Sequence, residues 1–296
     1  MPEMTAGSEP VAGKGSYAPN DVAVAILTVD RDPQYVFQTL ASMFLAEPAL
    51  HVMDPIWILV GSDDASHLSC LLHHDRIRVI ALSRPEAQRI KLWRIHRKFK
   101  HNYHRCLRVP LDGKRGIIVA EDDVVFRDHF VSRCLQAVQE IESDDLRDYA
   151  LALFSAYDFH RDPSFYRGQY YCSYGWSYYG TPCMYYPRKT AEFLAVEFER
   201  FLGDDNYDYE SDPQVLPGDL LIGRHYGTRM YASCHALAQH VGATSTGLGG
   251  GGGTVMFDRE YAPVPREAWG RSPLVSFPPH VGHDASSGFL QKPPNS

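Results

Sequence analysis

The stretch GIIVAEDDVVF, residues 116–126, places three adjacent carboxylates inside an otherwise apolar run. Residues 116–120 predict a strand that is buried on both faces of a parallel sheet. The carboxylates at 121–123 then fall at the carboxyl end of this strand, which is where open parallel sheets bind ligands. Because adjacent carboxylates beside a core repel one another unless a cation compensates them, the stretch predicts a Mg²⁺ or Mn²⁺ site that binds a diphosphate. The alternative is a surface turn whose aspartates cap the helix that starts near Asp128.

Strands and helices alternate on both sides of this stretch. A wholly apolar run at 21–29 is followed by a helical pattern whose apolar residues share one face. Further strands are predicted at 55–61, 77–82, 149–155 and 183–187. Helices are predicted at 86–108, 127–141 and 188–203, with a short one at 217–227. This alternation indicates an α/β fold with a mostly parallel, Rossmann-like sheet and helices on both of its faces.

The chain is expected to form one large domain with less ordered ends. Residues 1–20 predict a disordered arm, 21–257 the domain and 258–296 a Pro-rich tail. Within the domain, a nucleotide-binding half ends near residue 125, and an acceptor half continues to 257. The glycine run at 247–253 contains GxGxxG without the strand and helix of a dinucleotide fingerprint, so it is interpreted as a flap or an unstructured insertion.

Composition and charge exclude some classes of function. The 296 residues are 44% hydrophobic and carry a formal net charge of -7, so no global basic field points to nucleic acid. No apolar run is long enough for a transmembrane segment, and the first residues lack the basic and apolar regions of a signal peptide. The sequence therefore predicts a cytoplasmic protein.

Three motifs resemble glycosyltransferases of the GT-A fold. VAVAILTVDRDPQYVFQTLASM (22–43), FKHNYHRCLRV (99–109) with VAEDDVVF (119–126), and AQHVGATST (238–246) occur in the order found in that fold. The chain is most similar to the N-acetylglucosaminyltransferase IV family, glycosyltransferase family 54, and to related transferases that modify GPI glycans. The resemblance covers roughly residues 22–246 in patches and departs from the family in the middle. It implies a GT-A fold, a DxD-type metal motif and a UDP-sugar donor.

The resemblance also implies a metal centre. Asp123 would ligate Mn²⁺ or Mg²⁺, while Asp122 or Glu121 would bind ribose or a metal-bound water. His240 would be a second metal ligand, and imidazole combined with carboxylate oxygens is a ligand set that Mn²⁺ accepts. The alternative for His240 is a core histidine near a strand end.

Donor contacts are expected at the ends of the first two strands and on the basic helix. By the resemblance, Thr28, Val29 and Arg31 would lie at the uridine base and ribose. Asp63 would contact the nucleobase or cap a helix, two readings that remain open. The side chains of the basic helix expected at the diphosphate are Lys98 and Asn102.

Catalysis requires a base for the acceptor hydroxyl. Asp219 starts the short helix at 217–227, where GT-A enzymes carry an acidic base, although a simple N-cap is the alternative. Trp176 lies in an aromatic segment that would form a wall of the sugar pocket, with core filling as the alternative. Competing bases are Asp158, Asp212 and Glu210.

The sequence therefore predicts a metal-dependent, inverting glycosyltransferase, a hexosyltransferase that moves GlcNAc, GalNAc or a similar sugar from a UDP-sugar. The acceptor would be a hydroxyl of a glycan, a glycolipid or a small molecule. The alternative is a non-catalytic protein on the same fold that binds a nucleotide sugar or carbohydrate. A nucleotidyltransferase would also use an acidic metal site, but it needs a second metal carboxylate and a basic phosphate loop that the sequence lacks.

Overall fold

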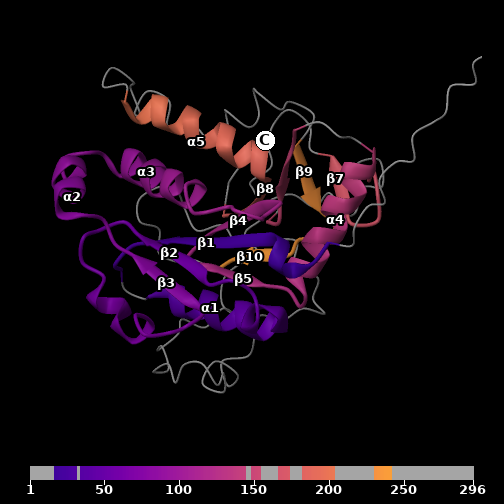
Figure 1. Cartoon of the computed structure of the whole chain (residues 1–296), viewed down its shortest axis with the longest axis horizontal. Coiled ribbons are helices and arrows are strands. Elements are labelled where there is room, and N and C mark those ends of the chain that lie inside the picture. Colours follow the sequence, from indigo (N-terminus) through magenta and orange to yellow (C-terminus); the bar gives the residue numbers. More distant parts are fainter. Residues whose placement is uncertain are drawn as a thin grey trace, which may run out of the picture.

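The computed structural model describes residues 17–31, 34–144, 148–154, 166–173, 182–203 and 230–241. Within these ranges the centre of the molecule is an eight-stranded sheet with the order β3-β2-β1-β4-β8-β6-β9-β7 (Figure 1). Its strands are β1 (Val22–Thr28), β2 (Ile56–Val60), β3 (Ile77–Ile80), β4 (Gly116–Glu121), β6 (Ala150–Ala152), β7 (Tyr171–Ser173), β8 (Cys183–Pro187) and β9 (Met230–Ser233).

Most strands of this sheet run in one direction. β1 pairs in parallel with both β2 and β4, and β2 with β3. β8 is antiparallel to β4 and to β6, and β7 is antiparallel to β9, so only β8 and β7 oppose the other six. The carboxyl ends of β1, β2 and β4 therefore meet at one edge of the sheet, as the sequence predicts.

A second, two-stranded sheet follows the acidic residues. β5 (Val124–Phe126) pairs in antiparallel fashion with β10 (Ala238–His240), so that His240 lies opposite Val124 and Ala238 opposite Phe126. This pairing joins the middle of the sequence to a segment more than a hundred residues later. It places His240 beside the turn that leaves β4.

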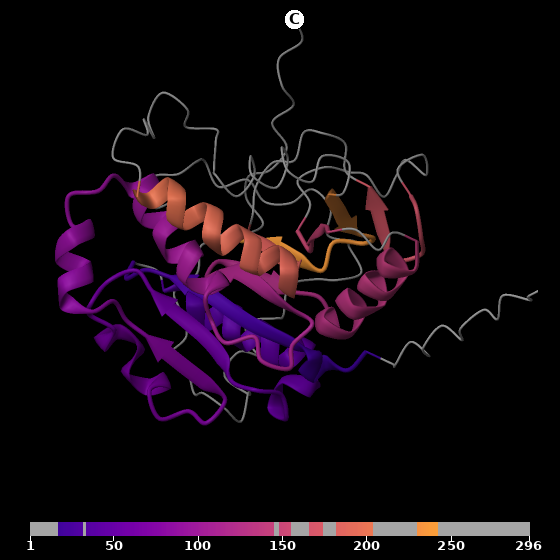
Figure 2. The same ribbon diagram turned by 45° about the horizontal axis from the view of Figure 1, so that its top comes forward.

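Helices cover both faces of the large sheet (Figures 1 and 2). Side chains of α1 and α4 enter the core on one face, and those of α3 and α5 enter the core on the other. The apolar run of β1 is continuous because its alternate residues serve the two cores, Val24 and Ile26 on one side and Ala25 and Leu27 on the other. The helices are α1 (Tyr35–Ala46), α2 (Arg84–Ile90), α3 (Ile95–Leu107), α4 (Phe130–Asp144) and α5 (Arg188–Gly203), with short 3-10 turns η1 (Pro19–Asp21), η2 (Pro48–His51) and η3 (Ser66–Leu71).

The predicted α/β class, with its mostly parallel sheet and two helical layers, is confirmed. The predicted helix at 86–108 is wrong in one respect, because a turn at 91–94 divides it into α2 and α3. The apolar residues on either side of the break have different environments: Ile90 is buried, whereas the side chain of Leu92 is 92% exposed. The boundaries of the arm, the domain and the tail stay predictions.

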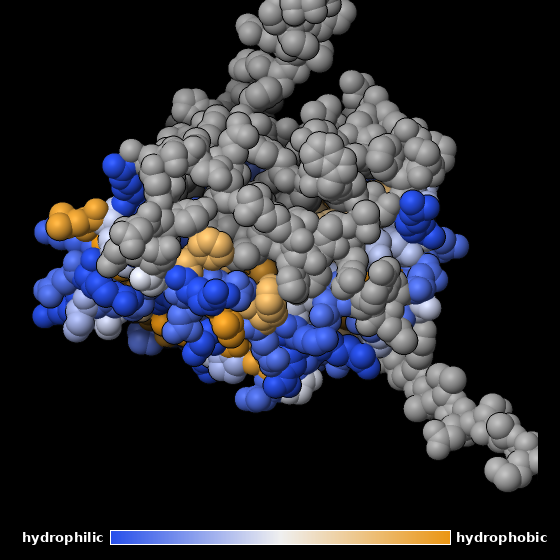
Figure 3. Space-filling model, turned by 90° about the horizontal axis from the view of Figure 1, so that it is seen from above, coloured by the Kyte–Doolittle hydropathy of each residue, from blue (hydrophilic) through white to orange (hydrophobic). Residues whose placement is uncertain are grey.

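The described surface on the side of α3 and α5 is mostly hydrophilic, with apolar side chains gathered in a few places (Figure 3). No helix in the described ranges combines the length and the apolar character needed to cross a membrane.

Candidate metal centre and nucleotide-binding edge

The acidic residues form the turn between β4 and β5. Glu121 ends β4, while Asp122 and Asp123 make the turn and are only 5% exposed each. The side chain of Thr39 in α1 holds the backbone of this turn by hydrogen bonds. Its hydroxyl lies 2.6 Å from the carbonyl oxygen of Asp122 and 2.8 Å from that of Val124, and it accepts a hydrogen bond from the Val124 N–H at 3.2 Å. A polar side chain on the buried face of α1 therefore fixes the backbone that presents the carboxylates.

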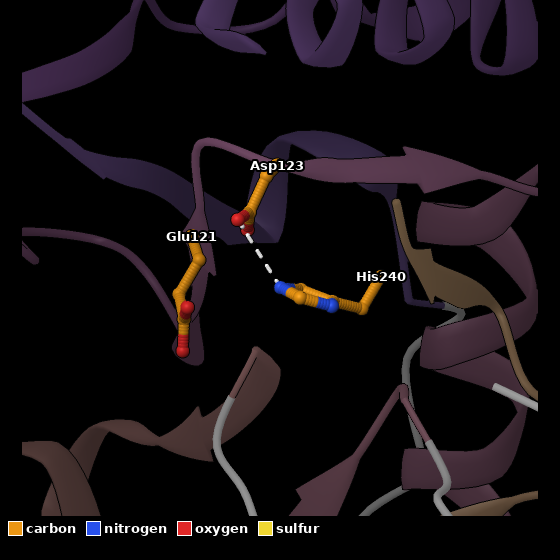
Figure 4. Close-up of side chains that lie close together, drawn as sticks. All are labelled: Glu121, Asp123 and His240. Carbon is orange, nitrogen blue, oxygen red and sulfur yellow. Dashed lines mark ion pairs between the residues drawn. The ribbon is translucent and has the colours of Figure 1, made fainter. Parts of the chain in front are cut away.

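Three metal-ligating side chains converge on this turn (Figure 4). Ligand atoms of Glu121, Asp123 and His240 all lie within 4.8 Å of one another. The Nε2 atom of His240 is 3.1 Å from Oδ2 of Asp123. The N–H of Val241 donates to the Asp123 carbonyl at 2.8 Å, so the end of β10 is tied to the turn by its backbone. Glu121 and Asp123 are two residues apart, and the β5–β10 pairing brings the distant His240 to them.

The donor set fits a hard or borderline divalent cation. Two carboxylates and one imidazole are ligands that Mn²⁺ and Mg²⁺ sites combine with water or phosphate oxygens. The Oδ1 atom of Asp123 is buried and has no hydrogen-bond partner among the described residues. Because a buried acceptor without a partner is costly, this oxygen is available to a cation.

Asp122 is used differently from its neighbours. The Thr28 hydroxyl donates to its Oδ2 at 2.6 Å, and the Arg31 guanidinium is paired with its Oδ1. Arg31 also lies 3.0 Å from Oδ2 of Asp123 and 4.7 Å from the ring centre of Tyr35. Asp122 therefore anchors the loop after β1, whereas Glu121 and Asp123 converge with His240.

The electrostatics of the turn reflect three carboxylates with one arginine and one histidine. Burial, followed by the charge of Asp123, raises the pKa of Glu121 to about 8. Burial also raises the pKa of Asp122 to about 6, against the opposing effect of Arg31. Burial acts in the same sense on Asp123, but the hydrogen bond and charge of His240, together with Arg31, outweigh it and lower the pKa of Asp123. Asp123 is thus the carboxylate that stays ionised most readily.

The loops after β1 and β2 are locked together at the same edge. The side-chain amide of Asn102 in α3 donates to the carbonyl oxygens of Thr28 at 3.3 Å and Leu59 at 2.9 Å. The Gly61 N–H also donates to Thr28 at 2.9 Å, and a Cβ at Gly61 would lie only 3.0 Å from the Val29 side chain. Asn102 therefore joins β1 to β2, and its contact with a diphosphate stays a prediction.

The remaining predicted site residues are less closely grouped. The Lys98 ammonium donates to the carbonyl of Lys91 at 2.9 Å, in an exposed position. Asp63 is exposed in the loop after β2, and the neighbouring Asp64, not Asp63, accepts from the Ser66 N–H at the start of η3. Asp219, Trp176 and the glycine run at 247–253 lie outside the described residues.

Two features of the site were not predicted from the sequence: the Thr39 support and the pairing of Arg31 with the carboxylates. The signal for Thr39 was present, since Thr39 and Ser42 interrupt the apolar face of α1. Ser42 likewise accepts a hydrogen bond from the Phe126 N–H at 3.3 Å. Polar residues on a buried helical face indicate a hydrogen-bonding partner across the interface.

Comparisons with known proteins give only distant similarities. No known family profile matches the chain, and no curated protein does. Among solved structures, galactosyltransferase LgtC in complex with donor and acceptor sugar analogs is 13% identical, with a TM-score of 0.41 over 71% of this chain and 72% of LgtC. Glycosyltransferase GlyE of Streptococcus pneumoniae TIGR4 is 13% identical, with a TM-score of 0.38 over 71% of this chain and 44% of GlyE.

A third similar structure is a 4-diphosphocytidyl-2C-methyl-D-erythritol synthase from Anaerococcus prevotii. It is 10% identical, with a TM-score of 0.40 over 74% of this chain and 90% of the synthase. At such low TM-scores and identities these similarities assign neither a family nor a function.

Proposed function

We propose that the chain is a metal-dependent glycosyltransferase of the GT-A type, which moves a hexose or N-acetylhexosamine from a UDP-sugar to an acceptor hydroxyl. The observation that carries this proposal is the convergence of Glu121, Asp123 and His240 at the carboxyl end of β4, where Oδ1 of Asp123 has no hydrogen-bond partner within the described ranges. The order of the sequence motifs that resemble GT-A enzymes, and in particular family 54, supports the same conclusion.

Asp123, His240 and Glu121 would hold Mn²⁺ or Mg²⁺. When bound, the cation supplies positive charge that stabilises the departing diphosphate. Asp122 has a positioning role, because its hydrogen bond from Thr28 and its ion pair with Arg31 fix the loop after β1 against the turn. With Val29, that loop would accommodate the uridine and ribose of the donor, and Asp63 and Lys98 would approach the nucleotide from the neighbouring elements.

The proposed chemistry is a single displacement at the anomeric carbon. Asp219 takes the proton of the acceptor hydroxyl while the acceptor oxygen bonds to the anomeric carbon and the bond to the UDP oxygen breaks. One displacement inverts the configuration of that carbon. Trp176 would form part of the wall against the donor sugar, and exclusion of water by this wall would favour transfer over hydrolysis.

The test is release of UDP from UDP-GlcNAc, UDP-GalNAc, UDP-glucose and UDP-galactose, each with Mn²⁺ and with a chelator. We expect release from at least one donor that disappears with chelator and in Asp123→Ala. Asp75→Ala is the matched control, because the Asp75 side chain is 79% exposed and outside the site. Release that persists undiminished in Asp123→Ala would refute the metal centre. Binding of UDP-sugars by the wild-type protein without any turnover would favour the non-catalytic alternative.

A further inference from the structure

A basic segment, residues 84–97, surrounds the turn that divides α2 from α3. It contains five lysine or arginine residues and one acidic residue, Glu86, so its formal charge is +4 on a chain whose net charge is -7. The basic residues are Arg84, Arg89, Lys91, Arg94 and Arg97. Because exposed charges of one sign attract the opposite charge over about a Debye length, this segment creates a local positive field on an acidic protein.

The positive charge of the segment is only partly compensated in the described part of the chain. Glu86 lies 3.1 Å from Nε2 of His101. Arg84, Arg89 and Lys91 are exposed, and none of them forms an ion pair with a described carboxylate. Three cationic side chains therefore face solvent without a counter-ion among the described residues.

Apolar side chains are exposed in the middle of the basic segment. Leu92 is 92% exposed and Ile95 is 43% exposed. At the end of the molecule where α2 lies, apolar surface projects beside hydrophilic surface (Figures 1 and 3). Val52 is 79% exposed elsewhere, but its nearest charged neighbour in the sequence is Asp54. Single exposed apolar residues are common, so the combination with several cations is what distinguishes Leu92.

Packing on both sides of Leu92 fixes the turn. Ile90 is buried, and the Trp93 N–H donates to the Ile90 carbonyl at 2.9 Å. The ring of Trp93 packs edge-on against the ring of His101, with 5.7 Å between the centroids. The guanidinium of Arg97 lies 4.1 Å from the centre of the Trp93 ring. Because its neighbours are held in this way, Leu92 stays at the tip of the turn, away from the core.

We propose that the basic segment binds the surface of a membrane that contains anionic phospholipids. Its lysine and arginine side chains would contact the headgroups, and Leu92 and Ile95 would enter the boundary between headgroups and acyl chains. A nucleic acid would also pair with the cations, but it has no apolar layer that removes Leu92 from water. A lipid surface therefore fits both features. This inference does not depend on the proposed transferase function.

The experiment measures co-sedimentation of the full chain with phosphatidylcholine vesicles, with and without phosphatidylserine, in the presence of chelator. The chelator prevents a divalent cation from bridging phosphatidylserine to the acidic turn. We expect binding only to the vesicles that contain phosphatidylserine, and weaker binding at high salt, because salt screens exposed charges. Leu92→Ser should weaken binding about threefold to tenfold, and Lys91→Gln about fivefold.

Two matched variants test whether these effects belong to the basic segment. Val52→Ser shortens another exposed apolar side chain, and Lys189→Gln removes a cation of α5 whose side chain is 80% exposed. Both variants should bind the vesicles as the wild-type chain does. All four substitutions replace exposed side chains, so each variant should fold like the wild-type chain, which circular dichroism checks.

Absence of binding to the phosphatidylserine vesicles would overturn the proposal, as would equal binding to vesicles of phosphatidylcholine alone. Equal losses in the matched variants would also overturn it, because binding would then not belong to the basic segment. Binding that weakens in Lys91→Gln but not in Leu92→Ser would replace the membrane by a soluble polyanion, such as a nucleic acid. Release of UDP tests the proposed transferase function separately from all of these outcomes.

Discussion

The acidic turn after β4 and the histidine pair of α3, His101 and His104, both bury ionisable side chains, but the buried groups differ in charge. On α3, His101 and His104 avoid the cost of a buried charge by remaining neutral, because burial lowers the pKa of both rings. In the turn, Asp123 remains ionised beside two other carboxylates, because Arg31 and the hydrogen bond with His240 lower its pKa. Neutral side chains need no counter-ion when they are buried, whereas a cluster with an excess of carboxylates attracts a cation.

The largest expected effect is on Mn²⁺ affinity, which should depend on His240 of the acidic turn and not on His104 of α3. His240→Ala should weaken Mn²⁺ binding on the order of 100-fold, because it removes one of three converging ligands. His104→Ala, on α3 and outside the candidate metal centre, should leave the Mn²⁺ affinity unchanged. Titration calorimetry measures both. Equal affinities in the two variants would show that His240 is not a ligand.

A second test compares a buried hydroxyl that supports the acidic turn with a buried hydroxyl elsewhere in the core. Thr39→Val removes the hydroxyl that bonds the backbone of Asp122 and Val124, and Thr190→Val removes a buried hydroxyl that donates to Tyr149 at 2.9 Å. Each should lower the free energy of unfolding by about 1 to 3 kcal/mol, measured by urea denaturation. Only Thr39→Val should also weaken Mn²⁺ binding, by about tenfold. A comparable loss of metal affinity in Thr190→Val would contradict the positioning role of Thr39.

The pH dependence of stability should reveal the raised pKa of Glu121 in the acidic turn. The pKa of Glu121 is raised from 4.5 to about 8, so the folded protein holds a proton that the unfolded chain releases in this window. The contribution of Glu121 to metal-free stability is therefore full below pH 4.5 and is lost as the pH rises toward 8. Glu121→Gln should flatten this decline in thermal melts from pH 5 to 8. An unaltered decline would mean that Glu121 titrates normally.

A smaller effect of opposite sign on the pH dependence of stability is expected at His101 of α3. The pKa of His101 is lowered from 6.5 to about 4. Between these pH values the unfolded chain binds a proton at His101 that the folded protein does not bind. The stability associated with neutral His101 is present above pH 6.5 and is lost as the pH falls toward 4. The difference in Tm between wild type and His101→Phe should change across this window. A constant difference would indicate that the ring is protonated in the folded protein as easily as in the unfolded chain.

The sequence predicted those parts of the fold in which neighbouring residues carry the information. The run at 21–29 contains β1, and the predicted strand at 183–187 matches β8, because strands buried on both faces must be apolar throughout. The helix at 188–203 was likewise readable from its period and matches α5. The break between α2 and α3 was not predicted, since the basic residues of this region obscure the change of buried face.

The candidate site, too, was predicted only in part from the sequence. The acidic triplet was recognisable because carboxylates interrupt an apolar strand. The place of His240 rested on a family resemblance, because three-residue strands such as β10 carry too little local signal to be predicted. Arg31 was expected at the ribose, and its ion pairs with Asp122 and Asp123 depend on how the loop after β1 meets the turn after β4.

By itself, then, the sequence determined the class of fold, the strand that carries the carboxylates and the edge of the sheet where they emerge. Hydrophobic periodicity is a local property, so it can be read from adjacent residues. The tertiary structure decided which side chains share that edge, which carboxylate is anchored by Thr28 and Arg31, and which oxygen of Asp123 has no partner in the part of the chain that the structure describes. Those outcomes depend on the register of strands distant in the sequence and on the burial of charge, neither of which is encoded in any short segment.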